Sequence, residues 1–260
     1  MEERKMGAYG TGICISRQNA LRGRSIRIND CTLREGEQTS DVAFSLHDKE
    51  RIAAVLDEAG VDRIQIAIGN SSQEEIRSLI ARMRRAKAEV LIIGFSADWK
   101  KQIDVAIECG FHCLNIAYRT SPYLLKIMNV SEEEALATSV GAVEYAKKRG
   151  AETVIFSPTD ATRSNWRFLK KIYARTVDAG ADEVYVLDTV GVASPVAMHR
   201  LVRKVKGVVK KPIGVHTHND YGLGLANSLA ALEAGAETVD TCVNGLGDRV
   251  GNPALAEVVT

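Results

Sequence analysis

The amino-acid sequence predicts an α/β protein of the (β/α)8 barrel class, and two observations support this prediction. Short runs rich in β-branched residues alternate with segments whose apolar residues recur at helical spacing, which is typical of parallel strands joined by helices. A related phrase also occurs in five places, with a glycine that ends a helix about four residues before a strand begins. The copies are EAGVDRI, ECGFHCL, KRGAETV, DAGADEV and EAGAETV.

Eight strands can be assigned along the chain. They are expected at 26–31, 63–68, 90–95, 113–118, 153–157, 183–188, 212–218 and 238–243. Eight parallel strands in 260 residues favour a closed barrel over an open doubly wound sheet, which is the alternative fold. Such an open sheet normally has a glycine-rich phosphate loop after its first strand, whereas this first strand leads into NDCTLREGEQ.

The segments between the strands have the apolar faces that barrel helices need. Two predicted faces are formed by Ile52, Val55, Leu56 and Ala59, and by Ile76, Leu79, Ile80 and Met83. Ser131 and Glu134 have the spacing of a capping box at a helix start. The last helix is expected to be incomplete, because the sequence ends at ALAEVVT.

Composition and charge limit the class of protein. The chain has 34 basic and 33 acidic residues, so its net charge of +1 attracts neither nucleic acid nor an anionic membrane, and neither is expected as a partner. No apolar run has the length of a membrane span, and the start MEERKMG does not resemble a secretory signal. Five cysteines without a CxxC pair indicate free thiols, so we expect a cytoplasmic location.

The stretch HTHNDYGLG, residues 216–224, places polar side chains where the seventh predicted strand ends. Barrel active sites lie at the C-terminal ends of the strands. Side chains two apart on a strand share a face, so His216 and His218 are both expected to point into the barrel mouth. Asp30 ends the first strand and Asn252 follows the last. These four residues are therefore a candidate site for a divalent metal such as Zn, Mn or Mg.

Less specific interpretations exist for the same residue types. An HxH pair alone is weak evidence for metal, because histidines are more often structural or surface residues. We interpret His47, His112 and His199 in that way, since they follow no predicted strand end. Cys31 could suggest a thiolate ligand or a nucleophile. Its alternation with Asp30 places it on the opposite face of the strand, so packing is the favoured interpretation.

Four motifs occur in order and together resemble one family: NDCTLREGEQ, DTVG at 188–191, HTHNDYGLGLANSLAALEAGAETVD at 216–240 and NGLGDRVGN at 244–252. They are similar to the DRE-TIM metallolyases, and most closely to the Claisen-condensing branch with homocitrate synthase, 2-isopropylmalate synthase and citramalate synthase. The resemblance extends from about residue 25 to the end. It implies residues 25–260 as a TIM-barrel catalytic domain, with residues 1–24 as an N-terminal extension.

The resemblance implies an activity and a metal site. The activity is condensation of an acyl-CoA, with acetyl-CoA expected, and a 2-oxo acid to a 2-hydroxy di- or tricarboxylic acid and free CoA. The residues that match the family's metal positions are Asp30, His216, His218 and Asn252.

Further side chains receive expected roles from the same resemblance. Arg34 matches the arginine that binds the carbonyl oxygen on which an alkoxide develops, and Glu35 is expected to orient the site. Thr189 matches a threonine that contacts the carboxylate of the 2-oxo acid. Arg163, in SPTDATR, is a further candidate for substrate binding.

The sequence departs from the family pattern around the substrate. Thr159 stands where a glutamate is usual on strand five, Gln65 takes an acidic position on strand two, and GFSADW lacks the usual arginine of strand three. Asp248 shortens the glutamate of the usual GER phrase. The sequence therefore identifies neither the general base nor the 2-oxo acid.

Two alternatives to the acyltransferase remain. One is a metal-dependent carbon–carbon lyase or aldolase of the same superfamily, and the other is a non-catalytic subunit that needs a partner chain. The C-terminal subdomains usual in this branch are not found after the barrel. We therefore expect a homo-oligomer, or a complex with a second subunit that supplies the missing part.

Overall fold

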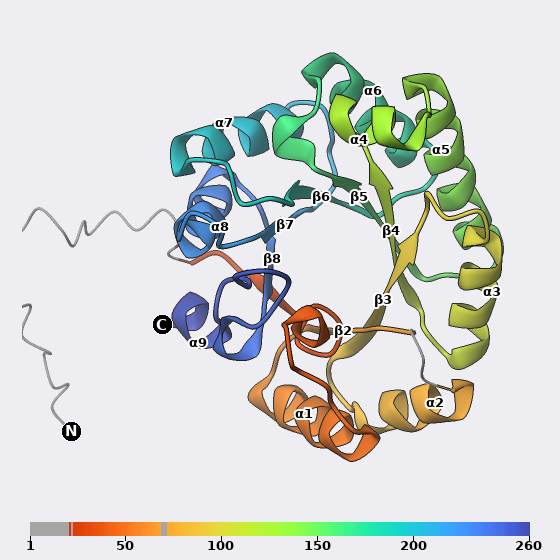
Figure 1. The fold of residues 1–260 in the computed structure, drawn as a ribbon, viewed down its shortest axis with the longest axis vertical. Helices are drawn as coiled ribbons and strands as arrows, with labels where there is room; N and C mark the ends of the chain where they lie inside the picture. Colours follow the sequence, from red (N-terminus) through yellow and green to blue (C-terminus); the bar gives the residue numbers. More distant parts are fainter. Residues whose placement is uncertain (1–20, 22, 69–71) are drawn as a thin grey trace, which may run out of the picture.

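The structure, a computed structural model, describes Leu21, residues 23–68 and residues 72–260, and in it eight parallel strands close into a barrel (Figure 1). The strands are β1 (Arg27–Asp30), β2 (Arg63–Ile66), β3 (Lys87–Ile93), β4 (Cys113–Arg119), β5 (Thr153–Thr159), β6 (Glu183–Asp188), β7 (Ile213–Thr217) and β8 (Thr238–Thr241). Each strand pairs with its neighbours in sequence, and β8 pairs with β1. The predicted barrel and its eight strands are confirmed, with ends that differ by at most three residues.

Helices form a ring around the barrel (Figure 1). They are α1 (Leu46–Ala59), α2 (Gln73–Arg82), α3 (Trp99–Cys109), α5 (Glu132–Lys148), α6 (Trp166–Asp178), α7 (Pro195–Lys206) and α8 (Gly224–Ala234). A short α4 (Pro122–Met128) follows β4, and α9 (Leu255–Val259) follows β8. Three 3-10 turns complete the elements: η1 (Gly36–Gln38), η2 (Ala161–Arg163) and η3 (Val243–Gly245). Within the described residues, no helix is both long and apolar enough to cross a membrane.

Most of the predicted extension, residues 1–24, lies outside the described residues. Arg24 is described, and its guanidinium donates hydrogen bonds to the backbone oxygens of Leu232 and Ala236 at the end of α8. The chain before β1 therefore contacts the helix that precedes β8.

The two predicted helix faces had different outcomes. On α2, Ile76 and Leu79 are buried as expected. On α1, Leu56 is buried, but Val55 is 64 % exposed, and Ala53 is fully buried instead. The α1 prediction is confirmed for Leu56 and for Ile52, which packs against the core, and was wrong for Val55 and Ala59, which are exposed.

Serine capping boxes fix the starts of three outer helices. The predicted capping box of Ser131 and Glu134 at the start of α5 is confirmed, because each side chain bonds the backbone N–H of the other residue. Ser45 with Asp48, and Ser72 with Glu75, form the same arrangement at α1 and α2. Each box satisfies two N–H groups that a helix start otherwise leaves unpaired.

The two faces of the strands differ in chemistry. Outward residues such as Ile64 and Val90 are apolar and belong to the core between sheet and helices. Inward residues are often polar: at the N-terminal end of the barrel, Arg63 lies between Glu183, at 2.9 Å, and Glu89, at 3.5 Å. A buried cation between two carboxylates compensates both charges where water is excluded.

The ring of Tyr185 fills the middle of the barrel. A Cβ atom on Gly214 of β7 would lie 2.2 Å from that ring, so only glycine leaves room for it there. The hydroxyl of Tyr185 lies 3.3 Å from Arg63 Nη2, toward the N-terminal end. The ring of Tyr185 thus occupies the middle of the barrel, while Glu89 connects the polar groups of the two ends, because it pairs with Arg63 and accepts from Gln65 Nε2.

Candidate metal and substrate site

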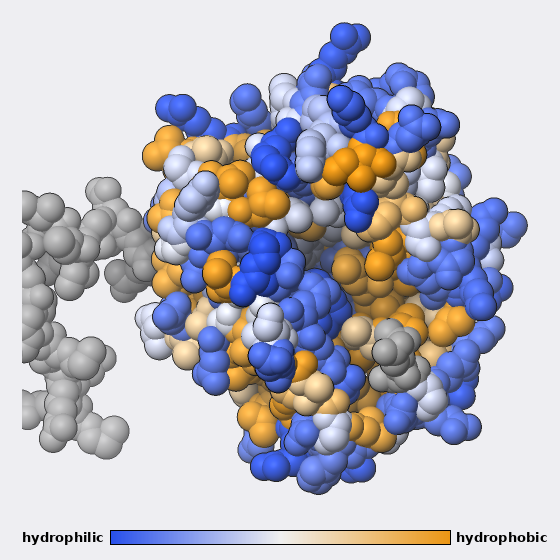
Figure 2. Space-filling view, viewed as in Figure 1, coloured by the Kyte–Doolittle hydropathy of each residue, from blue (hydrophilic) through white to orange (hydrophobic). Residues whose placement is uncertain are grey.

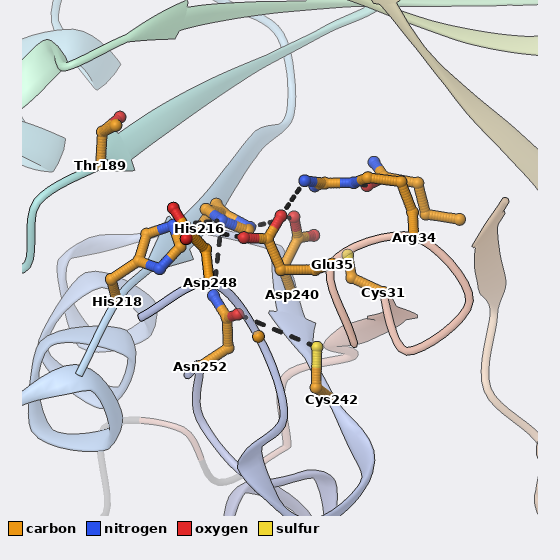
Figure 3. Close-up of polar contacts among 12 residues, drawn as sticks. Cys31, Arg34, Glu35, Thr189, His216, His218, Asp240, Cys242, Asp248 and Asn252 are labelled. Carbon is orange, nitrogen blue, oxygen red and sulfur yellow. Dashed lines mark hydrogen bonds and ion pairs between the residues drawn. The ribbon is translucent and has the colours of Figure 1, made fainter. Parts of the chain in front are cut away.

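His216 lies on β7 and His218 directly follows that strand. Both side chains point into the barrel mouth, as the HxH spacing predicted (Figure 3). His216 and His218 are each 5 % exposed, and their Nε2 atoms lie 3.2 Å apart. Asp240 of β8 accepts from His216 Nδ1 at 2.9 Å. That bond places the proton of His216 on Nδ1 and leaves the lone pair of Nε2 facing His218.

Glu35 completes a set of three candidate ligands with these histidines. Its Oε1 lies 3.7 Å from His218 Nε2. Burial, followed by the neighbouring His216, lowers the pKa of His218 far below its usual value, which favours the neutral ligand form. Two nitrogens that bind one ion at about 2.1 Å lie roughly 3.0 to 3.4 Å apart, so the 3.2 Å separation fits a shared divalent cation.

A tight turn after β1 brings Glu35 over the end of the strand. The backbone N–H groups of Arg34, Glu35 and Gly36 all donate to the carbonyl oxygen of Cys31, at 3.0, 2.7 and 3.3 Å. The chain therefore folds back on itself, and η1 follows immediately. The sequence predicted that the first strand ends at residue 31, but not the turn that follows it.

Asp30 does not join the histidines. Its carboxylate accepts from Thr32 N at 2.9 Å and from Thr241 Oγ1 at 3.3 Å, and burial raises its pKa to about 6. Among the described residues, neither of the two clusters with metal-ligating potential includes it. The prediction of Asp30 as a metal ligand assumed that its side chain faces the barrel interior. Asn29 faces the interior instead, since it contacts the inward-facing Asp240.

Cys31 lies on the face opposite Asp30, as predicted, but that face is the barrel interior. Asn29 Nδ2 lies 3.9 Å from Cys31 Sγ and 3.0 Å from Asp240 Oδ1. Cys31, His216 and Asp240 form the second cluster with metal-ligating potential, and all three are buried. Burial raises the pKa of the Cys31 thiol well above its usual value.

Asn252 lies beside the histidines and faces them with its amide nitrogen. Nδ2 donates to the backbone oxygen of Thr217 at 2.9 Å and lies 3.4 Å from His216 Nε2. Oδ1 lies 3.9 Å from Cys242 Sγ. A Cβ at Gly247 would be 2.1 Å from Oδ1, so this glycine makes room for the asparagine.

Arg34 reaches the same mouth from the other side. Its Nε donates to Gln65 Oε1, and its Nη1 pairs with Glu35 Oε2. Gln65 Nε2 in turn donates to the buried Glu89 at 2.6 Å. The guanidinium is therefore held by its neighbours, with its planar group fixed next to the candidate metal ligands (Figure 3).

These side chains border one cavity at the C-terminal end of the barrel. Figure 2 shows a hollow near the centre of this end, with hydrophobic residues over β3 and β4 beside it. The cavity is lined by Arg34, Glu35, Gln38, Gln65, Leu91, Asn115, Ala117, Ser157, Thr159, Tyr185, Leu187, Thr189, His216, His218, Asp240 and Asp248.

The two other candidates for substrate binding differ in position. Thr189 lines the cavity, and its hydroxyl accepts from the backbone N–H of Asp160 at 2.8 Å. Arg163 is not part of the lining. Its guanidinium forms two bonds to Asp160, at 2.8 and 2.7 Å, so it holds the turn after β5.

The remaining histidines and one unassigned acid complete the outcome of the sequence predictions. His47, His112 and His199 are exposed, which confirms their interpretation as surface residues. Asp240 received no role from the sequence, although it ends one of the motifs. The available signal was the alternation along this strand: Asp240 lies two residues before Cys242, and side chains two apart share a face.

Comparison with protein families places these features in context. The HMGL-like family profile matches residues 25–260. A probable 2-isopropylmalate synthase of Methanopyrus kandleri is 44 % identical over 235 residues, which cover 90 % of this chain and 47 % of the relative. A 2-isopropylmalate synthase of Methanocaldococcus jannaschii is 46 % identical over 90 % of this chain and 45 % of its own length.

A homocitrate synthase AksA of Methanopyrus kandleri is 41 % identical over 89 % of this chain and 58 % of its own length. The chain thus spans about half the length of the curated relatives it matches. Among solved structures, a hydroxymethylglutaryl-CoA lyase from Pseudomonas aeruginosa superposes with a TM-score of 0.76 at 23 % identity, over 91 % of this chain and 84 % of that one. At this identity the similarity shows the fold alone.

Proposed function

The chain belongs to the HMGL-like (DRE-TIM) family, and from this membership and the geometry of the mouth we propose that it is a metal-dependent acyltransferase. The reaction joins an acyl-CoA, with acetyl-CoA expected, to a 2-oxo acid. The main observation in support is the convergence of Glu35, His216 and His218 beside Arg34 at the C-terminal end of the barrel. Relatives of 41 to 46 % identity that are named synthases favour condensation over the lyase alternative.

We propose Glu35, His216 and His218 as the metal ligands, in place of a set with Asp30. Asn252 would add its amide oxygen after rotation of the amide about its last side-chain bond. When bound, the metal ion supplies Lewis-acid polarisation of the carbonyl group of the 2-oxo acid. Asp240 orients His216 through Nδ1, and such a partner commonly raises the basicity of a ligand imidazole.

Arg34 has the position to stabilise the negative oxygen that develops during condensation. A base, which the sequence does not identify, first takes a proton from the acyl carbon next to the thioester. The new carbon–carbon bond then forms between that carbon and the keto carbon, and the keto oxygen becomes an alkoxide. A fixed guanidinium next to that oxygen lowers the energy of the transition state. Hydrolysis of the thioester with one water then releases the free thiol of CoA.

The apolar part of the cavity lining supports an uncharged side chain on the 2-oxo acid. Leu91, Ala117 and Leu187 provide apolar surface there. Ser157 and Asn115 each present a buried oxygen without a hydrogen-bond partner. In the described part of the lining, Arg34 is the one guanidinium and there is no lysine. Because Arg34 already pairs with Glu35, a second carboxylate on the substrate would have no separate counter-ion.

A neighbouring groove suits the acyl-CoA arm. It shares Arg34 and Leu91 with the mouth cavity, and it adds the apolar Ile93 and Val105 and the basic Lys101. A pantetheine chain packs well on apolar surface, and a phosphate group attracts a lysine. Ile93→Asp should therefore raise the KM for acetyl-CoA while metal binding stays unchanged; an unaltered KM would remove this groove from the acyl-CoA path.

The first test is release of CoA thiol from acetyl-CoA by metal-reconstituted protein, with 2-oxoisovalerate, pyruvate, 2-oxoglutarate, oxaloacetate and glyoxylate as partners. We expect release with an acid of uncharged side chain, such as 2-oxoisovalerate, and loss of release with a chelator. If no acid gives release while the protein binds about one metal ion per chain, as one three-ligand site predicts, the lyase or the partner-dependent subunit becomes the better proposal.

A matched pair of variants tests the ligand set. Glu35→Gln should lose bound metal and thiol release together, because an amide oxygen is a weaker ligand than a carboxylate. Asp30→Asn should keep the metal, since its carboxylate bonds only Thr32 and Thr241. The opposite result, with metal lost from Asp30→Asn and kept by Glu35→Gln, would restore the ligand predicted from the sequence.

Association and location remain part of the proposal. An apolar groove on the outside of α1, lined by Phe44, Ile52, Val55 and Val243, supports association with another polypeptide, either a second copy or a second subunit. Sedimentation of the protein alone should show an oligomer if the partner is a second copy. The four described cysteines form no disulfide, which supports a reducing, cytoplasmic location.

A further inference from the structure

The second cluster in the mouth has a donor set different from that of the proposed metal site. It combines the sulfur of Cys31 with a ring nitrogen of His216 and a carboxylate oxygen of Asp240, and the three ligand atoms lie within 4.8 Å of one another. Cys31 is 1 % exposed, His216 5 % and Asp240 3 %. Thiolate, imidazole and carboxylate together suit zinc and softer divalent cations, whereas Mg²⁺ and Mn²⁺ prefer oxygen ligands.

A buried amide donor lies beside the thiol of Cys31. Asn29 directs its amide nitrogen at Cys31 Sγ, at 3.9 Å, and at Asp240 Oδ1, at 3.0 Å. Burial raises the pKa of the Cys31 thiol, so we expect the thiolate with a bound metal ion and not without one. Asn29 is itself fully buried, and its Oδ1 has no hydrogen-bond partner, so the cluster also contains an unsatisfied oxygen.

An ion can reach this cluster from the mouth. His216 and Asp240 both line the cavity, and Cys31 lies behind them (Figure 3). The two clusters share His216. In the first cluster, Asp240 holds His216 by its Nδ1 at 2.9 Å. An ion bound to Asp240 takes this carboxylate from the ring and so weakens the alignment of His216 toward Glu35 and His218.

We propose that Cys31, His216 and Asp240 form a second metal position, which takes a soft divalent cation such as Cd²⁺ and thereby weakens the position formed by Glu35, His216 and His218. Binding replaces the thiol proton of Cys31 by the metal ion, and the proton passes to the buffer. The competition, but not the sulfur position itself, rests on the proposed function. A soft cation would accordingly inhibit the protein by displacing the harder one.

The test is a titration of the 260-residue chain with Cd²⁺, observed through the ultraviolet charge-transfer band of a cadmium–thiolate bond. Wild type should show the band, and Cys31→Ser should lose it. Cys109→Ser is the matched control: Cys109 is also buried but lies at the end of α3, outside the cluster, so the band should persist. A band of equal strength in Cys31→Ser would overturn the proposal.

Two further measurements keep the test decisive. X-ray absorption on the wild-type cadmium complex should show a single sulfur with nitrogen and oxygen neighbours; coordination by nitrogen and oxygen alone would overturn the proposal without any variant. Electron paramagnetic resonance should show Mn²⁺ leaving the wild type as Cd²⁺ is added, and staying in Cys31→Ser. If Mn²⁺ binds neither protein, the proposed catalytic metal position fails, while the cadmium band still decides on the sulfur position.

Discussion

The two ends of the barrel interior use similar residue types for opposite results. At the N-terminal end, Arg63 lies between Glu89 and Glu183, and opposite charges are paired. At the C-terminal end, two imidazole nitrogens face each other at 3.2 Å, and Arg34 and Glu35 stand beside them. One end pairs its charges with one another, whereas the other gathers lone pairs that a cation would satisfy. Stability should therefore depend most on the first end, and activity on the second.

Replacement of Arg63, the buried cation between two glutamates, should have the largest effect on stability. Arg63→Met leaves Glu89 buried without its cation and Glu183 with Arg27 alone, so we expect the free energy of unfolding to fall by roughly 3 to 5 kcal/mol. Denaturant unfolding measures this. Arg27→Met is the control, because Arg27 also pairs with Glu183 but its side chain is 37 % exposed, and it should cost less than about 1 kcal/mol. Equal losses would mean that the two ends do not differ in this way.

Replacement of the mouth guanidinium should affect rate and not stability. Arg34→Lys removes the planar donor group, so kcat should fall by about 100- to 1000-fold, as for loss of an oxyanion donor, while metal content is retained. Arg163→Lys is the matched control, because Arg163 binds Asp160 outside the cavity. A comparable loss of kcat in the control would show that Arg163 contributes to the substrate site after all.

The buried Asp30 should make stability depend on pH. Its pKa is raised from 3.8 to about 6, mainly by burial, so its contribution to stability is fully present below pH 4 and is lost as the pH rises through 6. A shift of about two units corresponds to at most about 3 kcal/mol. The measurement is the free energy of unfolding of the metal-free protein from pH 4 to 7, relative to Asp30→Asn. If the difference in free energy of unfolding between the wild type and Asp30→Asn does not change over this range, ionisation of Asp30 does not destabilise the folded protein.

The smallest expected effect concerns the orientation of His216. Asp240→Asn removes the carboxylate that accepts from Nδ1, so metal affinity should fall by about 10- to 100-fold while the fold is retained. Metal titration by calorimetry measures this. An affinity equal to that of the wild type would mean that the ring is aligned by its packing and not by Asp240.

The sequence predicted the barrel because strand and helix periods are local properties. It also predicted that His216 and His218 share a face, since alternation fixes relative direction. It could not predict which face of β1 is inside, because both Asp30 and Cys31 are compatible with burial. Nor could it place Glu35, whose position depends on three backbone N–H groups that converge on the carbonyl oxygen of Cys31. Tertiary contacts decide which face of a strand lies inside and how a turn bends. The spacing of residues in the sequence does not reveal these contacts.

Tyr185 sets the depth of the mouth cavity. Its ring occupies the space that Gly214 leaves, it lines the mouth cavity, and its hydroxyl contacts Arg63 toward the N-terminal end of the barrel. The size of this one side chain therefore limits how far into the barrel the mouth cavity extends. A smaller residue at this position would deepen the cavity toward the buried Arg63.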